Sequence, residues 1–139
     1  MAGYSQTPLL KKLGIKENCR VAFVNAPEDF EQRLGALPAG SIVVSQIRQS
    51  FDCALIFVKS EAHLRKDFAK FVARLSPAGT LWVAWPKKLS RIVTDLRFET
   101  VQAIGLEAGL VDTKICAIDE IWSGLRFVVP LQNRSQWNA

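Results

Sequence analysis

Several segments of this chain are apolar on both faces of an extended backbone, and this pattern limits the fold more than any other feature. Residues 51–58 are apolar apart from Asp52, and residues 20–24 and 80–85 are also rich in apolar side chains. A half-exposed strand alternates apolar and polar residues, whereas a strand inside a parallel sheet covered by helices is apolar on both faces. We therefore expect these segments to form the centre of a parallel sheet.

Helix signals separate the strands. Ser60 caps a predicted helix with one apolar stripe, and residues 76–79 are expected to end it as a turn. Other helices are predicted over residues 7–14, 27–35 and 98–109, and other strands over residues 42–45, 113–118 and 125–131. Residues 119–124 are short enough to join the last two strands as an antiparallel pair. This order specifies an α/β three-layer sandwich, a mostly parallel sheet with a C-terminal antiparallel hairpin, in one domain over residues 1–139.

Composition narrows the classes of protein. No apolar run reaches the roughly 18 residues that span a bilayer, and residues 1–7 lack the profile of a signal peptide, so we expect a cytoplasmic protein without a membrane partner. Cys19, Cys53 and Cys116 lie far apart and are interpreted as small apolar residues rather than metal or redox sites. The net charge of +5 would suit an anionic partner, but no strip of basic and aromatic residues favours nucleic acid.

The order of elements resembles the class I methyltransferase fold, which implies a Rossmann-like domain. That family holds S-adenosylmethionine with a glycine-rich turn after the first strand and an acidic residue at the end of the second. Here the turn reads Asn25-Ala26-Pro27, in which Pro27 has no N–H to donate, and the second predicted strand ends in Ser45-Gln46. The resemblance therefore supplies the scaffold without its cofactor determinants, and no cofactor is expected.

A second resemblance covers nearly the whole chain. Several stretches look like a small bacterial domain family of unknown function: residues 4–9 (YSQTPL), 12–16 (KLGIK), 84–88 (AWPKK), 94–96 (TDL) and 122–127 (WSGLRF). This resemblance implies no established activity.

Candidate ligand-binding residues follow from the rule that ligands of open α/β sheets gather beyond the carboxyl ends of the parallel strands. The six residues predicted there are Asn25, Lys59, Ser60, Trp85, Lys87 and Lys88. Three ammonium groups near a helix start could hold a phosphate or a carboxylate. The alternative is that they are solvated lysines at loop ends.

The remaining candidates are weaker. Trp82 is predicted to be a core residue, whereas Trp85 and Trp122 are candidates for ligand contact. Asp95 is expected to cap the helix that follows it. His63 is interpreted as a lone exposed histidine, and Asp119 and Glu120 form only a weak carboxylate pair. The sequence contains no nucleophile elbow, phosphate-binding loop or metal-ligand spacing.

Two hypotheses follow. The first is a non-catalytic Rossmann-like module that binds a small anionic ligand or a protein partner, which could be a second copy of the chain. The alternative is an S-adenosylmethionine-dependent, methyltransferase-like enzyme with an unconventional cofactor site, in which Asp95, Asp119 or Glu120 supplies polar groups.

Overall fold

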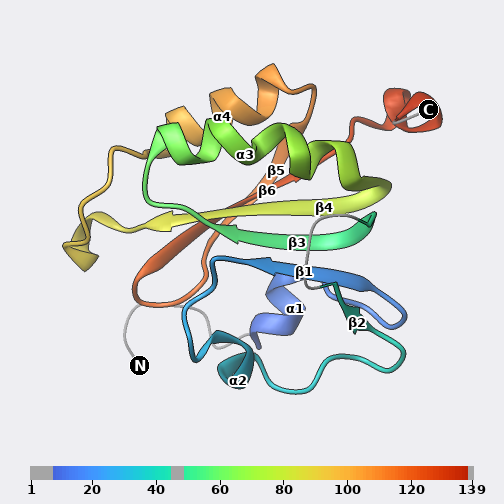
Figure 1. Ribbon diagram of the computed structural model, residues 1–139, viewed down its shortest axis with the longest axis horizontal. Helices are drawn as coiled ribbons and strands as arrows, with labels where there is room; N and C mark the ends of the chain where they lie inside the picture. The colour runs from blue at the N-terminus through green and yellow to red at the C-terminus, as the bar shows by residue number, and fades with distance from the viewer. Residues whose placement is uncertain (1–7, 45–48, 138–139) are drawn as a thin grey trace.

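A twisted sheet with strand order β2-β1-β3-β4-β6-β5 forms the middle layer of the protein, as the computed structural model shows for residues 8–44 and 49–137 (Figure 1). The first four strands are parallel, and β6 is antiparallel to both of its neighbours, β4 and β5. The strands are β1 (Arg20–Val24), β2 (Ile42–Val43), β3 (Phe51–Phe57), β4 (Leu75–Pro86), β5 (Val111–Ala117) and β6 (Trp122–Val128). The predicted mostly parallel α/β fold with a closing hairpin is confirmed.

Helices cover both faces of the sheet. In Figure 1, α3 and α4 lie above the sheet and α1 and α2 lie below it. The helices are α1 (Leu9–Leu13), α2 (Phe30–Leu34), α3 (Glu61–Arg74) and α4 (Phe98–Glu107), with 3-10 turns η1 (Lys88–Ser90) and η2 (Leu131–Gln136). Among the described residues, no helix combines the length and the apolar character that crossing a bilayer requires.

The central strands are apolar on both faces because they serve two cores. In β3, Cys53, Leu55 and Phe57 pack toward α1 and α2, whereas Ala54 and Ile56 pack toward α3 and α4. The same alternation holds in β4, where Trp82 and Trp85 belong to opposite cores. Trp82 is fully buried, as predicted.

Helix α3 shows how the upper layer is held. Leu64, Phe68 and Phe71 are buried on one stripe, and burial of each is worth about 1.5–3 kcal/mol. Helix α4 approaches the sheet through Gly105, where a Cβ would collide with the ring of Phe127. Glycine at this position therefore sets the distance between α4 and β6.

The lower layer is tied to the sheet by rings and by one buried donor. The indole N–H of Trp82 donates to the carbonyl oxygen of Leu13 at 3.1 Å, which fixes α1 on the sheet. Phe30, Phe57 and Trp122 pack edge to face, with ring centroids 5.1 and 5.0 Å apart along this series. Helix α2 is thus linked through aromatic contacts to the end of the hairpin.

Some expected boundaries were wrong, for local reasons. Residues 76–79 do not form a turn between elements but belong to β4, which pairs with β3 on both sides of an irregularity. Gly79 makes this possible, because a Cβ there would lie 2.8 Å from the backbone oxygen of Asp52. Helix α2 begins at Phe30 rather than near Pro27, and β6 begins at Trp122 rather than at Leu125.

Strand β2 is shorter than predicted within the described chain, and the expected strand end at Ser45 and Gln46 lies outside the described residues. Thr7, the expected cap of the first helix, also lies outside them. Strands β2 and β5 form the two edges of the sheet, and Ile115 of β5 is 54% exposed.

Candidate functional site

The strand order reverses direction between β1 and β3, which creates the position where open α/β sheets bind ligands. From β1 the chain crosses to β2 on one side and then returns to β3 on the other side. The segments that leave β1 and β3 therefore diverge, and they open a cleft at the carboxyl ends of these strands. Asn25 follows β1 directly, and Lys59 lies close behind β3.

The cleft consists of two adjoining lobes that share Pro27, Lys59 and Trp122. The larger lobe has a volume of about 540 Å³, and the smaller one about 390 Å³. These volumes lie within the range of small-molecule sites. The larger lobe is completed by Asp29, Arg33, Ile92, Asp119, Glu120 and Ile121, and the smaller one by Asn25, Phe57 and His63.

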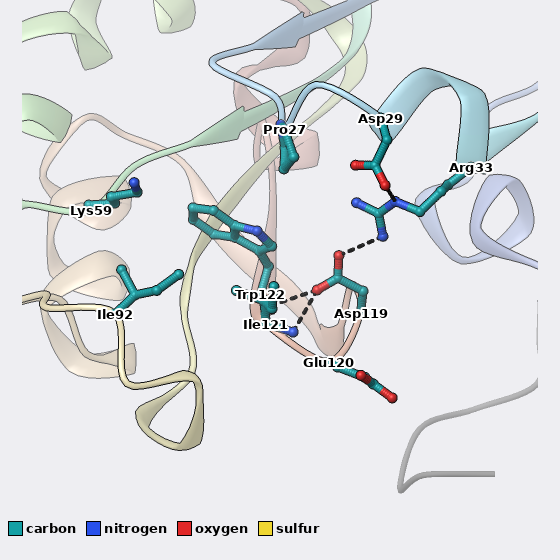
Figure 2. Close-up of a pocket in the computed structure, with 9 residues that line it drawn as sticks. All are labelled: Pro27, Asp29, Arg33, Lys59, Ile92, Asp119, Glu120, Ile121 and Trp122. Carbon is teal, nitrogen blue, oxygen red and sulfur yellow. Dashed lines mark hydrogen bonds and ion pairs between the residues drawn. The ribbon is translucent and has the colours of Figure 1, made fainter.

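Trp122 forms the wall between the lobes. Figure 2 shows its indole ring between Lys59 on one side and the Arg33–Asp119 pair on the other. The side chain is held edge to face against Phe57 and is only 6% exposed. Its indole N–H has no acceptor among the described residues. Every fully buried side-chain nitrogen among those residues has a hydrogen-bond partner, so this nitrogen is not fully buried. The indole N–H therefore retains contact with the open space of the cleft.

Asp119 fixes the hairpin that carries Trp122. One carboxylate oxygen accepts from the backbone N–H groups of Ile121 and Trp122, both at 2.8 Å, and the other accepts from Arg33 at 3.0 Å. Arg33 also pairs with Asp29 at 3.1 Å, so in this corner of the cleft two carboxylates share one guanidinium and one negative charge is left over (Figure 2). The Asp119 carboxylate is thereby used to position Trp122.

Lys59 differs from Arg33, because its ammonium has neither a hydrogen bond nor an ion pair among the described residues. It is exposed, and it is the basic residue that lines both lobes. An unpaired cation beside an apolar wall can attract an anionic group without first breaking a protein contact.

Ser60 and Asp95 satisfy the start of α3 beside Lys59. The Ser60 hydroxyl accepts from the His63 N–H at 3.1 Å, and Asp95 accepts from the Glu61 N–H at 2.8 Å. The expectation that Asp95 caps the following helix was wrong, since α4 has no side-chain cap. Both groups that could have bound a ligand at this helix end are thus occupied by capping.

The structure divides five of the six predicted site residues between two places. Asn25 and Lys59 line the cleft, and Ser60 caps α3 at its side. Trp85 and Lys88 line a separate pocket on the α3 and α4 face. Lys87 lines neither place, but its backbone N–H donates to Ile121 at 2.7 Å and ties the segment after β4 to the hairpin.

Comparison with solved structures identifies the architecture. A magnesium protoporphyrin IX methyltransferase from Synechocystis PCC 6803 with bound SAH superposes with a TM-score of 0.58 at 9% identity, over 87% of this chain and 78% of that one. A SAM-dependent methyltransferase from Aquifex aeolicus gives 0.54 at 16% identity, over 91% and 90%. The chain has a methyltransferase-like Rossmann fold.

This methyltransferase-like fold also occurs in a possible exported protein from Bordetella parapertussis, with a TM-score of 0.63 at 14% identity, over 87% of this chain and 64% of that one. No protein-family model and no curated protein sequence matches the chain. At these identities the likeness concerns the fold alone, since one fold hosts many functions.

The turn after β1, residues 25–27, contains no glycine. Asn25 has a positive φ of 56°, so it adopts the left-handed conformation that a glycine would otherwise supply. Its side chain and the ring of Pro27 line the cleft at the point where a glycine turn would leave room and donate N–H groups. Among the described residues, no group of three or more His, Cys, Asp or Glu is placed to hold a metal ion.

Sequence reasoning missed His63 and Arg33 as cleft residues. His63 lies in the first turn of α3, so its ring reaches the smaller lobe, where Nε2 is 3.5 Å from the Asp67 carboxylate. The sequence did contain a signal for His63: it lies three residues after the Ser60 cap, which places it in the first turn of the helix. Arg33 gave no such signal, because its partner Asp119 is distant in the sequence.

Proposed function

We propose that this protein is a non-catalytic binding module that takes a small anionic molecule in the cleft between β1 and β3. The observation that carries the proposal is the unpaired ammonium of Lys59, which lines both lobes beside the unpartnered indole N–H of Trp122. The position at the strand-order reversal supports it, because ligands of this fold class gather there.

The cleft chemistry suggests a ligand with a flat or apolar body and one anionic group. Phe57, Pro27 and Trp122 offer apolar walls against which such a body can pack. Lys59 would bind the carboxylate or phosphate, while Asn25 and the Trp122 N–H would orient its oxygens. Glu120, on the wall of the larger lobe, would repel a second anionic group and so limit where the charge can lie.

We propose binding without chemistry because two of the three acidic groups of the larger lobe, Asp29 and Asp119, serve the structure. Asp119 accepts three hydrogen bonds, from Ile121, Trp122 and Arg33, and Asp29 pairs with Arg33. A carboxylate fixed in this way would lose its contacts if it took up a proton from a substrate. We also infer that the chain belongs to the small bacterial family of unknown function described above, and that it acts in the cytoplasm.

The test begins with native mass spectrometry of freshly purified protein, followed by a thermal-shift panel of nucleotides, adenosyl compounds and aromatic carboxylates. For any compound that binds, calorimetry is repeated on Lys59→Gln and on the matched control Lys66→Gln, which removes the same charge from an exposed site on α3. Loss of one charge-assisted contact predicts about tenfold weaker binding for Lys59→Gln and little change for Lys66→Gln. Unchanged binding by Lys59→Gln would show that the site lies elsewhere.

The second candidate function is S-adenosylmethionine-dependent methyl transfer. Two observations favour it: the likeness to methyltransferases, and the His63 ring in the smaller lobe, which Asp67 could orient as a general base. We rank methyl transfer second because the turn after β1, residues 25–27, has no glycine. Titration with S-adenosylmethionine and S-adenosylhomocysteine decides the matter, because saturable heat supports the enzyme and flat titrations at millimolar ligand remove it.

A further inference from the structure

A second pocket, with a volume of about 520 Å³, lies on the opposite face of the sheet from the hairpin tryptophan. It is lined by Trp85, Pro86, Lys88, Thr94, Leu96, Arg97 and Glu99. Trp85 packs with the core under α3 and α4, whereas Trp122 packs with the core above α1 and α2. The segment after β4 passes through η1 to the start of α4 (Figure 1), and it supplies most of the residues that line this second pocket.

The start of α4 has free donors beside this pocket, which Arg97 and Glu99 line. Helix α4 has ten residues, its N-cap is Arg97, and no side chain caps it. The backbone N–H groups of Phe98, Glu99 and Thr100 have no acceptor among the described residues. This contrasts with α3, where Ser60 and Asp95 accept from the first turn. A helix end of this kind favours an anion through its N–H groups and its dipole.

Trp85 supplies an independent indication of a ligand. The residue is only 6% exposed, yet its indole N–H has no acceptor in the described part of the chain. In that part of the chain every fully buried side-chain nitrogen has a hydrogen-bond partner. The indole nitrogen of Trp85 has none, so it is not fully buried and its N–H reaches open space. Trp85 is one of the residues that line the pocket, and we infer that its N–H opens there. A deeply buried donor that points into a pocket normally has an acceptor there.

The charges of the pocket favour an anion. Lys88 and Arg97 form no ion pair among the described residues, and Thr94 retains a hydroxyl hydrogen although its oxygen accepts from the Leu96 N–H. Glu99 is the acidic residue of the lining, and its negative charge offsets part of the positive charge of Lys88 and Arg97. Arg97 can bind two oxygens of one phosphate through its planar guanidinium.

We propose that this pocket binds the phosphoryl group of a small phosphomonoester. The α4 N–H groups, Arg97, Lys88 and the Trp85 N–H would share the phosphate oxygens, and the remaining volume would hold the organic part of the ester. The site is independent of the Lys59 cleft and goes beyond the proposed function.

The experiment follows the tryptophan Nε1–H signals by proton–nitrogen NMR during titration with inorganic phosphate and with glycerol 3-phosphate at constant ionic strength. One indole signal should shift saturably, and it should be absent in Trp85→Phe. Lys88→Gln and Arg97→Gln, both at exposed positions, should each weaken binding about tenfold. Lys66→Gln should leave it unchanged, and assignment of the shifting signal to Trp85 rather than Trp122 separates this site from the cleft.

Three results would overturn the proposal. The site is wrong if neither probe binds saturably, or if Lys66→Gln weakens binding as much as Arg97→Gln does. The assignment of an ester is wrong if inorganic phosphate binds as tightly as glycerol 3-phosphate. Should Trp85→Phe fail to fold, the Lys88 and Arg97 variants still decide between these outcomes, because they alter no core residue.

Discussion

Replacement of Asp119 tests whether one carboxylate positions the wall of the cleft. In Asp119→Ala the backbone N–H groups of Ile121 and Trp122 lose their acceptor, and Arg33 loses one of its two carboxylate partners. A hydrogen bond to a charged group contributes about 1.5–3 kcal/mol, with the low end suited to partial exposure, and an exposed ion pair contributes up to about 1 kcal/mol. The Asp119 side chain is 17% exposed, so we expect a loss of roughly 2–4 kcal/mol.

The free energy of unfolding is measured by urea denaturation, with circular dichroism as the signal. Asp119→Asn is the matched variant, because its amide oxygen can still accept from the hairpin N–H groups while the charge facing Arg33 is lost. Its free energy of unfolding should fall by about half as much as that of Asp119→Ala. Arg33→Gln should lose no more than about 1 kcal/mol. If Asp119→Ala lies within about 0.5 kcal/mol of the parent protein, or if it equals Asp119→Asn, the carboxylate does not hold the hairpin.

Three further predictions concern the fold around the two pockets. Gly105→Ala should destabilise the protein by about 1–2 kcal/mol, although alanine is the better helix former, because its Cβ meets Phe127; a gain in urea midpoint would contradict this. Asp95→Ala should cost about 1 kcal/mol and speed hydrogen exchange at the Glu61 amide; a normal rate there would refute capping of α3. Burial raises the pKa of Cys53 from 9.0 to about 11. As the pH rises above 9, the Cys53 thiol therefore ionises in the unfolded chain before it does so in the folded protein. The free energy of unfolding should fall between pH 9 and pH 11. Over this pH range the parent protein should lose about 2–3 kcal/mol more of its free energy of unfolding than Cys53→Ala does.

The sequence predicted the fold because its strongest signals are local and repetitive. Residues 51–58 are apolar on both faces, and that pattern requires helices on both sides of β3. Ser60 and Gly35 mark a helix start and a helix stop through their own backbone chemistry, and both lie where expected. The antiparallel hairpin followed from the short connection between its strands.

The sequence could not predict contacts between distant segments. Asp95 resembled a cap for the next helix, but the fold brings it to the start of α3. The insertion of β6 between β4 and β5 leaves no local signal, and neither does the pairing of Arg33 with Asp119. For the same reason, Trp85 and Lys59 were grouped by their strand ends, although they line different pockets.

The alternation of side chains along β4 was a usable signal that the site prediction did not apply. Trp82 and Trp85 are an odd number of positions apart, so their rings lie on opposite faces. Once Trp82 is placed against α1, Trp85 must face α3 and α4. The two pockets therefore follow from strand geometry, whereas their lining residues required the complete fold.

The most direct test of the binding cleft is an NMR titration in which the Nε1–H signals of Trp122 and Trp85 are followed together. A compound selected by thermal shift is added to the parent protein and to Lys59→Gln. We expect the Trp122 signal to shift saturably in the parent protein, with about tenfold weaker binding in Lys59→Gln and no movement of the Trp85 signal. A stabilising compound that leaves the Trp122 signal in place, or that shifts it equally in Lys59→Gln, would show that the cleft beside Lys59 is not the binding site.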